Sequence, residues 1–369
     1  MIFHKNRALL VENMKKRWSV QYLVPLARLV KQILYCRITK KRSPIHVSFH
    51  ITNKCNLRCN YCYANYEKRF DKPVQDFTTR DIISIIDDIY ALGTRWVVLL
   101  GGEPLLRKDI GYIVKYIKSK NILCEIVTNG ILIKKKIEAI KDADLLCVSI
   151  DGTEEANDAI RGNNTYKRAV EGLSIATRYG MNTRIHATLT KLNNNEENLE
   201  HLNYLARKFH TSFGYSSPIL HDYNKIDELC VSKEDVVEFW KIVEEFKKKG
   251  ANNYYSNDAL DYVIQWPFDH AKIITDKKEF EMFPRFKVKP CFVAQRSCYI
   301  DSEGVVYPCL MNGIKNGLNL HEVGFKKAWD YLKDYKCGAC AYLQYVEFSN
   351  VMNLDWHSFG LGVKTFFRR

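Results

Sequence analysis

The stretch Thr52-Asn53-Lys54-Cys55-Asn56-Leu57-Arg58-Cys59-Asn60-Tyr61-Cys62 places three cysteines in one short loop. The run before it predicts a strand over residues 46–52, so the cysteines lie where the chain leaves this strand. Cys55, Cys59 and Cys62 offer three thiolates, whereas a zinc site or a cubane iron–sulfur cluster normally takes four protein ligands. Either a distant fourth ligand completes the site, or one metal position stays open for catalysis.

Six strand–helix steps follow one another along the chain. Short apolar runs bounded by turn residues predict the strands, and helical spacing of apolar residues predicts the helices. Strands are expected at residues 46–52, 96–100, 122–128, 145–150, 182–189 and 212–216, and helices at 79–92, 110–118, 166–179 and 196–209. This alternation predicts a parallel, barrel-like α/β sheet, in which chemistry collects at the carboxyl ends of the strands.

A glycine-rich motif, Gly101-Gly102-Glu103-Pro104, lies at the end of the second predicted strand. Together with the cysteine loop, it resembles the GGEP and CxxxCxxC signatures of the radical S-adenosylmethionine (SAM) superfamily. The resemblance covers residues 45–217 and implies a partial (β/α)6 TIM-like barrel. It also implies a [4Fe–4S] cluster held by Cys55, Cys59 and Cys62, with SAM on the open iron.

The same resemblance implies a reaction. An electron from a donor such as flavodoxin or ferredoxin passes through the cluster and cleaves SAM to methionine and a 5′-deoxyadenosyl radical. That radical abstracts a hydrogen atom from the substrate, and the protein supplies positioning and exclusion of water.

The resemblance assigns SAM contacts to residues that match the family's motifs. Tyr61 is expected against the adenine ring. Gly101 and Gly102 let the backbone approach the SAM amino group, because glycine has no side chain, and Glu103 helps to fix that region. Asn129, in Thr128-Asn129-Gly130, is a weaker candidate that fits a turn residue equally well.

Three further candidates follow the fourth predicted strand. Ser149 and Asp151 are placed for ribose or methionine contacts. Arg161, in Asn157-Asp158-Ala159-Ile160-Arg161-Gly162, resembles an arginine that pairs with the SAM carboxylate, a task that suits a guanidinium fork. Each of the three also fits a loop cap or a surface ion pair.

A second cysteine group occupies the last part of the chain and comprises Cys291, Cys309, Cys337 and Cys340. Residues 300–309 predict a hairpin with its turn at Glu303-Gly304, which brings Cys291 and Cys309 together, and a helix over 322–332 delivers the CxxC pair. The group resembles the SPASM/twitch type of auxiliary-cluster extension. No cysteine follows Cys340, so the resemblance implies one auxiliary iron–sulfur cluster of the [4Fe–4S] type. A structural zinc site with four thiolates is the alternative.

The other cysteines are expected to be buried. Cys298 either replaces one auxiliary ligand or is a buried thiol, and we favour the second. Twelve cysteines in a chain of cytosolic character indicate metal ligation rather than disulfides. Those that stand alone are predicted to be core thiols, and they are Cys36, Cys124, Cys147 and Cys230.

Positive charge is concentrated at both ends of the chain. The net charge is +14; residues 1–46 carry eleven Lys/Arg against Glu12, giving +10, and residues 356–369 give +3, which leaves +1 for the rest. The spacing of residues 26–38 predicts a basic amphipathic helix, with Pro25 at its start. This helix either packs across the end of the barrel or lies in a membrane interface, and the basic ends either bind an anionic surface or are simply solvated.

The sequence predicts five segments. They are a basic N-terminal helical segment (1–44), the core barrel (45–217), a helical connector with a capping box at Ser232 and Asp235 (218–289), an auxiliary-cluster domain (290–345) and an aromatic, basic tail (346–369). No signal peptide and no run of about 20 apolar residues is apparent. We therefore expect a cytoplasmic protein, peripheral to the membrane if its basic helix binds one.

Three functions are compatible with the sequence. The first is a radical SAM enzyme that modifies a ribosomal peptide or protein side chain, as most relatives with such an extension do. The second is a membrane-surface radical SAM enzyme acting on a lipid, isoprenoid or small metabolite, and the third is a non-catalytic metal-binding protein. Nucleic acid is not expected as a partner. No catalytic acid or base is predicted. Residues at the end of the last strand and in the segment after it fit either a substrate-facing or an ordinary surface loop: Tyr215, His221, Asp222 and Tyr223.

Overall fold

The computed structural model describes residues 20–62, 76–217, 229, 231–270, 272–274, 276–310, 317–335, 337–355, 358 and 360. Several residues named above lie outside this part of the chain. They are Cys230, the loop residues 221–223, the first 19 residues and most of the aromatic residues of the predicted tail.

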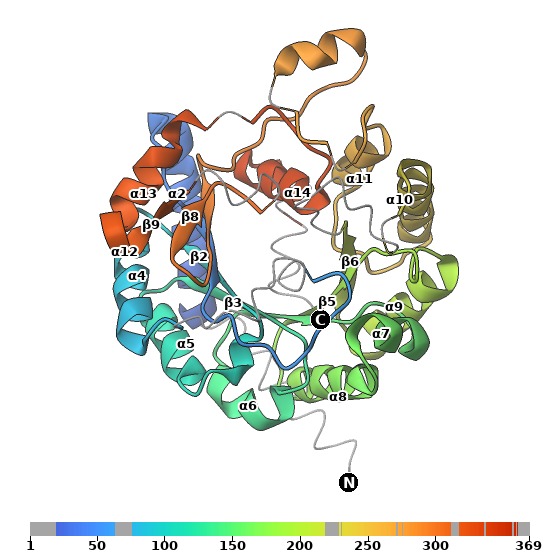
Figure 1. The fold of residues 1–369 in the computed structure, drawn as a ribbon, viewed down its shortest axis with the longest axis horizontal. Coiled ribbons are helices and arrows are strands. Elements are labelled where there is room, and N and C mark those ends of the chain that lie inside the picture. Colours follow the sequence, from blue (N-terminus) through green and yellow to red (C-terminus); the bar gives the residue numbers. More distant parts are fainter. Residues whose placement is uncertain are drawn as a thin grey trace.

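The described residues build one sheet whose strands run in the order β6-β5-β4-β3-β2-β1-β7-β8-β9. Each neighbouring pair from β1 to β6 is parallel, and the six strands curve around a central space without closing (Figure 1). This confirms the predicted partial barrel. The strands are β1 (His46–His50), β2 (Trp96–Leu100), β3 (Leu123–Thr128), β4 (Leu145–Ser149), β5 (Thr183–Thr188) and β6 (Ser212–Ser216).

A ring of helices covers the outside of the barrel (Figure 1). Each helix buries one apolar stripe against the strands; in α4, for example, Ile82, Ile85, Ile86 and Ile89 are buried. A capping box of Thr78 and Asp81 starts α4, and Asn195 caps α9. The ring comprises α4 (Thr79–Ala91), α5 (Ile110–Ser119), α6 (Ile133–Ile140), α7 (Glu154–Arg161), α8 (Thr165–Arg178) and α9 (Glu196–Lys208).

The predicted C-terminal hairpin is present and extends the barrel sheet. Strand β7 (Ser297–Ile300) pairs antiparallel with β8 (Val305–Tyr307), and β8 pairs with β9 (Leu318–Asn319). Gly304 has a φ of +89° in the hairpin turn, a conformation that favours glycine. Strand β7 also pairs in parallel with β1, which the sequence did not predict. Helices α12 (Leu320–Val323) and α13 (Phe325–Tyr331) and the 3-10 turn η5 (Leu332–Asp334) lead to the CxxC pair.

The open side of the barrel, between β6 and β7, is filled by a helix that the sequence did not predict. Helix α14 (Leu343–Met352) crosses this side in Figure 1, and most of it falls in the segment assigned to the tail. Its apolar residues occupy more than one face, so they give no clear helical period. Three connector elements come before α14 in the chain. They are α10 (Lys233–Lys248), which starts with the predicted Ser232 cap, α11 (Asn257–Ile264) and the 3-10 turn η3 (Lys277–Met282).

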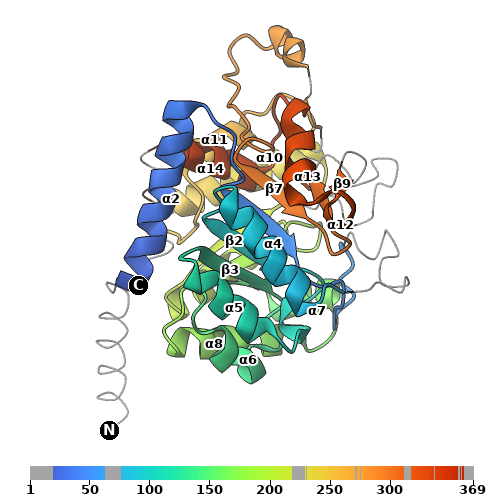
Figure 2. The same cartoon turned by 90° about the vertical axis from the view of Figure 1, so that its left-hand side faces the viewer.

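Helix α2 (Val20–Thr39) lies along one side of the molecule (Figure 2). Its residues Leu29 and Ile33 pack with Ile45 and Leu123, which stand at the amino ends of β1 and β3. The helix therefore packs across the amino end of the barrel, as one of the two predictions had it. The predicted start at Pro25 is wrong, because the helix already includes Val20 and Pro25 lies inside it. No helix among the described residues is long and apolar enough to cross a membrane.

We predict that Asp144 stabilises the amino end of the sheet. Its carboxylate accepts hydrogen bonds from Lys118 Nζ (2.6 and 2.7 Å) and from the backbone N–H of Cys124 (2.7 Å), and the residue is 1% exposed. Asp144→Ala removes the carboxylate that compensates the buried Lys118 ammonium, so we expect a loss of about 3–5 kcal/mol in the free energy of unfolding, measured in urea. The exposed pair of Glu138 and Lys141 is the control, because solvent screens this pair and Glu138→Ala is expected to leave the free energy of unfolding nearly unchanged. Equal losses in both variants would contradict this assignment.

Candidate active site

The cysteine loop is held against the glycine motif by a backbone ladder that continues past the ends of β1 and β2. Ile51 N–H donates to Leu100 O (3.0 Å), Gly102 N–H to Thr52 O (2.9 Å) and Glu103 N–H to Lys54 O (2.8 Å). A Cβ at Gly101 would stand 2.5 Å from Thr52 O, and one at Gly102 would stand 2.4 Å from Lys54 O. The two glycines are thus required for the close approach of the chain to its own cysteine loop.

Glu103 links this region to the neighbouring strand β3. Its buried carboxylate accepts hydrogen bonds from Leu105 N–H (2.9 Å), Thr128 Oγ1 (2.8 Å) and Asn129 N–H (2.8 Å). Burial raises the pKa of Glu103 to about 7, while the hydrogen bonds from Asn129 and Leu105 act in the opposite direction. The carboxylate therefore fixes the ends of β2 and β3 to each other.

Asn129 joins the same site from the end of β3. Its Nδ2 donates to Asn56 Oδ1 in the cysteine loop (2.9 Å), and its Oδ1 accepts from Ile131 N–H (3.1 Å). Asn129 forms the turn after β3, as one of its two predicted roles required. It also contacts the loop that carries the cysteines.

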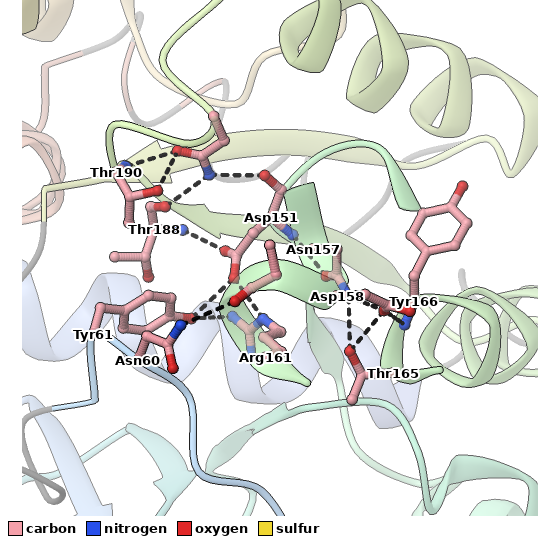
Figure 3. A network of polar contacts seen from close by, with 12 residues as sticks. Asn60, Tyr61, Asp151, Asn157, Asp158, Arg161, Thr165, Tyr166, Thr188 and Thr190 are labelled. Carbon is pink, nitrogen blue, oxygen red and sulfur yellow. Dashed lines mark hydrogen bonds and ion pairs between the residues drawn. The ribbon is translucent and has the colours of Figure 1, made fainter. Parts of the chain in front are cut away.

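Tyr61, Asp151 and Arg161 form one network at the carboxyl ends of β4 and β5 (Figure 3). Arg161 Nε donates to Asp151 Oδ2 (2.6 Å), Tyr61 Oη donates to the same oxygen (3.2 Å), and an Arg161 terminal nitrogen also contacts Tyr61 Oη. Asp151 Oδ1 accepts from Thr188 N–H (2.8 Å), and Asp151 is fully buried. The structure thus brings three of the sequence-predicted residues together as an internal ion pair capped by a phenol.

A second asparagine fastens the loop to helix α7. Asn60 N–H donates to Ile160 O (2.9 Å), and Asn60 Nδ2 donates to Ala159 O (2.9 Å). Carbonyls of the last helical turn have no partner within the helix, so Asn60 satisfies two of them. Asn56 and Asn60 therefore hold the cysteine loop from two sides.

The three cysteines are partly buried and near one another. Burial raises the pKa of Cys55 to about 11 and that of Cys59 to about 12, and the Arg161 guanidinium counteracts this rise at Cys59. Thiolates at these positions are therefore stable when a bound cation compensates their charge. Among the described residues, no three His, Cys, Asp or Glu side chains converge on the position of a single metal ion. A cubane does not require such convergence, because each of its thiolates binds a different iron.

The interior of the barrel contains a partly open cavity of about 280 Å³. Leu100, which precedes Gly101, borders it, and so does His186, which lies opposite Ser149 in the sheet register. Ser149 itself ends β4 and is half-buried. The cavity therefore begins next to the residues predicted to contact SAM.

Polar groups of the lumen were not predicted from the sequence. Arg184 pairs with the buried Glu125, and Tyr254 lies 5.1 Å from the Arg184 guanidinium. His186 contacts Tyr254 Oη through Nδ1 (2.6 Å) and Ser216 Oγ through Nε2 (3.0 Å). Burial, and next the Arg184 cation, lowers the pKa of His186 to about 3, so this imidazole is neutral near pH 7. Arg184, His186 and Thr188 alternate with the apolar residues Ile185 and Ala187 in β5. This alternation could have indicated that polar side chains line the cavity.

The second cysteine group also gathers in space. Cys309 and Cys340 are buried together against Tyr342, and Cys291 packs beside them. A hydrogen bond with Cys337, and then burial, raises the pKa of Cys291. Cys298 instead lies in the main core near Arg42. Three of the lone cysteines, Cys36, Cys124 and Cys147, are buried as predicted.

The cysteine group adjoins the lumen through two tyrosines. Tyr342 and Tyr345, whose ring centroids are 5.2 Å apart, line the cavity. Tyr345 Oη accepts a hydrogen bond from the N–H of Leu310, the residue after Cys309 (3.1 Å). The cavity thus lies between the end of the barrel that carries the first cysteine loop and the second cysteine group.

Comparison with known proteins places this geometry in a family. Residues 49–205 match the model of the radical SAM superfamily. The Fe-coproporphyrin III synthase of Methanosarcina barkeri (strain Fusaro / DSM 804) is 31% identical over 162 residues, which are 42% of this chain and 40% of that protein. The AdoMet-dependent heme synthase of the same strain is 23% identical over 333 residues, which are 83% of this chain and 90% of that protein.

A solved structure shares the fold over most of the chain. Streptococcus suis SuiB bound to its precursor peptide SuiA is 18% identical with a TM-score of 0.61, covering 85% of this chain and 74% of that one. At this identity the likeness concerns the fold alone. The family model and the two relatives agree with one another, and residues 49–205 therefore form a radical SAM domain.

Proposed function

We propose that this protein reductively cleaves SAM at a [4Fe–4S] cluster and abstracts a hydrogen atom from a peptide or protein side chain. The observation that carries the first part is the ladder that holds the cysteine loop against Gly101 and Gly102 at the carboxyl end of the barrel. It holds three cysteines in one loop at the carboxyl end of the barrel, and the family implies SAM and a [4Fe–4S] cluster for such a loop. When bound, these two cofactors supply an electron and a 5′-deoxyadenosyl radical.

The chain's own residues would bind and orient the cofactors. Cys55, Cys59 and Cys62 would hold the cluster, and their partial burial limits access of water to it. Glu103 offers a buried carboxylate next to the glycine motif, and an ammonium group placed beside it would lower its raised pKa and favour the ionised form. Asp151, Arg161 and Tyr61 already satisfy one another, so they would position the loop as well as contact SAM.

The cavity inside the barrel favours one uncharged side chain of a peptide substrate as the reacting group. Its volume of about 280 Å³ is just below the range of roughly 300–1,000 Å³ that is usual for drug-sized ligands. Arg184 and Glu125 neutralise each other, and both His186 and His46 have pKa values lowered to about 3, chiefly by burial. A cavity of this size and neutrality suits one amino-acid side chain better than a porphyrin-sized or phosphorylated metabolite. That the similarly folded SuiB binds a precursor peptide supports the same substrate class.

We also propose one auxiliary [4Fe–4S] cluster on Cys291, Cys309, Cys337 and Cys340. Cys309 and Cys340 are buried together, Cys291 packs beside them, and Cys337 bonds with Cys291. Gly338 N–H donates to Ile274 O (2.7 Å), which holds the CxxC segment in place. An electron donor such as flavodoxin or ferredoxin would serve the first cluster.

The central claim predicts the effect of removing the first cysteine group. The triple variant should form no 5′-deoxyadenosine from SAM after anaerobic reconstitution and reduction, because it has no open iron to bind SAM. Its substitutions are Cys55→Ala, Cys59→Ala and Cys62→Ala. Iron should fall from about eight to about four atoms per chain, since the auxiliary cysteines are intact. Intact SAM cleavage in this triple variant would refute the proposal.

The ladder predicts a milder and more specific defect. Gly102→Ala places a methyl group 2.4 Å from Lys54 O, so the cysteine loop must shift. We expect the iron held by the first cysteine group, and the SAM cleavage that depends on it, to fall at least about tenfold, while the auxiliary iron is retained. Gly360→Ala is the control, because no atom of the described residues lies within 4 Å of a Cβ at that position. Equal iron contents in the two variants would argue against the role of the ladder.

The lumen predicts a separation of SAM cleavage from substrate modification. Val127→Phe narrows the cavity without touching the cysteine loop, so SAM cleavage without substrate should persist. Where a short open reading frame beside the gene supplies the peptide, its modification, followed by mass spectrometry, should fall at least about tenfold. The control is Val170→Phe, at a half-buried position on the outer helix α8. Unchanged modification in the Val127 variant would place the substrate elsewhere.

A further inference from the structure

Helix α2 carries a second apolar stripe that the barrel does not use. Its inner stripe, Leu29, Ile33 and Cys36, is at most 3% exposed and packs against the barrel. Leu23, Leu34 and Ile38 are 39%, 42% and 80% exposed. With Ala27 they are spaced by 4, 7 and 4 residues, which places them in one line along the helix. Tyr35, 45% exposed, stands beside this line. We call Leu23, Ala27, Leu34 and Ile38 the outer stripe.

The outer stripe is unusual for the surface of this protein. Among the described residues, eleven large hydrophobic side chains are exposed, and four of them lie on α2: Leu23, Leu34, Tyr35 and Ile38. Single exposed apolar residues are normal, but a line of them on one helix marks an interaction surface. The helix does not need this stripe for folding, because its inner stripe already provides the contact with the barrel.

The charge of α2 selects the kind of partner. The helix contains no acidic residue, and Arg28, Lys31 and Arg37 flank the outer stripe. Arg28 contacts Lys120 O and Tyr90 Oη, and Arg37 contacts Asn353 O, so both retain their positive charge against neutral partners. The nearby carboxylate of Asp87 is paired with Lys120 (2.6 Å). A second copy of the same face would bring cation against cation, and a nucleic acid would leave the aliphatic side chains without an apolar environment.

We propose that the outer face of α2 docks this protein on an anionic phospholipid surface. Leu23, Leu34 and Ile38 enter the boundary between headgroups and acyl chains, and Arg28, Lys31 and Arg37 contact lipid phosphates. The helix lies in the plane of the interface and does not cross it. This docking is independent of the substrate proposed above.

The fold gives the docking a direction. Helix α2 packs on Ile45 and Leu123, at the amino ends of β1 and β3, whereas the cysteine loop leaves the carboxyl end of β1. Figure 2 shows α2 beside the strands, with its lower end free of the hairpin and of α14. Docking through α2 therefore keeps the cysteine loop at the opposite end of the strands, accessible to a soluble electron donor and to a peptide.

Flotation of the full chain with vesicles tests the proposal. We expect binding to phosphatidylcholine vesicles that contain phosphatidylglycerol, weak binding to pure phosphatidylcholine, and weaker binding at high salt. The double change Leu34→Ser and Ile38→Ser should reduce binding to the anionic vesicles by roughly tenfold or more. Met282→Ser, at a position 73% exposed on another face, is the matched control and should bind normally. Because all three positions are exposed, the thermal unfolding of these variants should match that of the wild-type chain.

Several outcomes would overturn this inference. One is a failure to float with anionic vesicles, and another is normal flotation of the double variant. Normal flotation of that variant combined with loss on deletion of residues 1–19 would assign the membrane contact to that segment instead. Concentration-dependent dimers that disappear in the double variant, without any vesicle binding, would assign the outer stripe to a second copy of this chain.

Discussion

The approach of the glycine motif to the cysteine loop is the constraint on which the active end of the barrel depends. Two glycines let the backbones of β1 and β2 stay hydrogen-bonded beyond their last residues, where side chains would otherwise separate them. The position of Glu103 follows from this contact, and Glu103 in turn fixes Thr128 and Asn129 at the end of β3. Asn129 then returns to the loop through Asn56. Hydrogen bonds that connect the ends of β1, β2 and β3 thus set the geometry of the loop that carries the three cysteines.

The other side of the loop is fixed by charge rather than by backbone pairing. Asp151 and Arg161 are both buried and satisfy each other, and Tyr61 adds a hydrogen bond to the same carboxylate oxygen. Removing either charged partner would leave the other buried and unpaired, which is costly in a protein interior. The pair therefore stabilises a single arrangement of β4, α7 and the loop. A ligand that binds here meets side chains whose positions are already determined.

The sequence predicted the elements of the barrel better than their contacts. The strands β2 and β6 were found with their observed bounds, because apolar runs end there at turn residues. The pairing of β7 with β1 was missed, since it joins segments far apart in the chain and no local pattern encodes it. Helix α14 was missed because its apolar residues show no single face. The glycines were predicted to approach SAM, and the structure shows that they also let the chain approach Thr52 and Lys54 of its own cysteine loop.

The lumen shows why a substrate could not be read from motifs. Glu125, Arg184 and His186 come from two strands, and α14 and the segment with Tyr254 complete the wall. Only folding brings them together, although alternate polar residues in β5 pointed inward. The resulting pocket has a neutral ion pair at one side, two histidines that stay uncharged near neutral pH, and aromatic rings toward the second cysteine group. The cofactor motifs fix where a radical would form, and the shape and neutrality of this wall decide which chemical group can be held beside it.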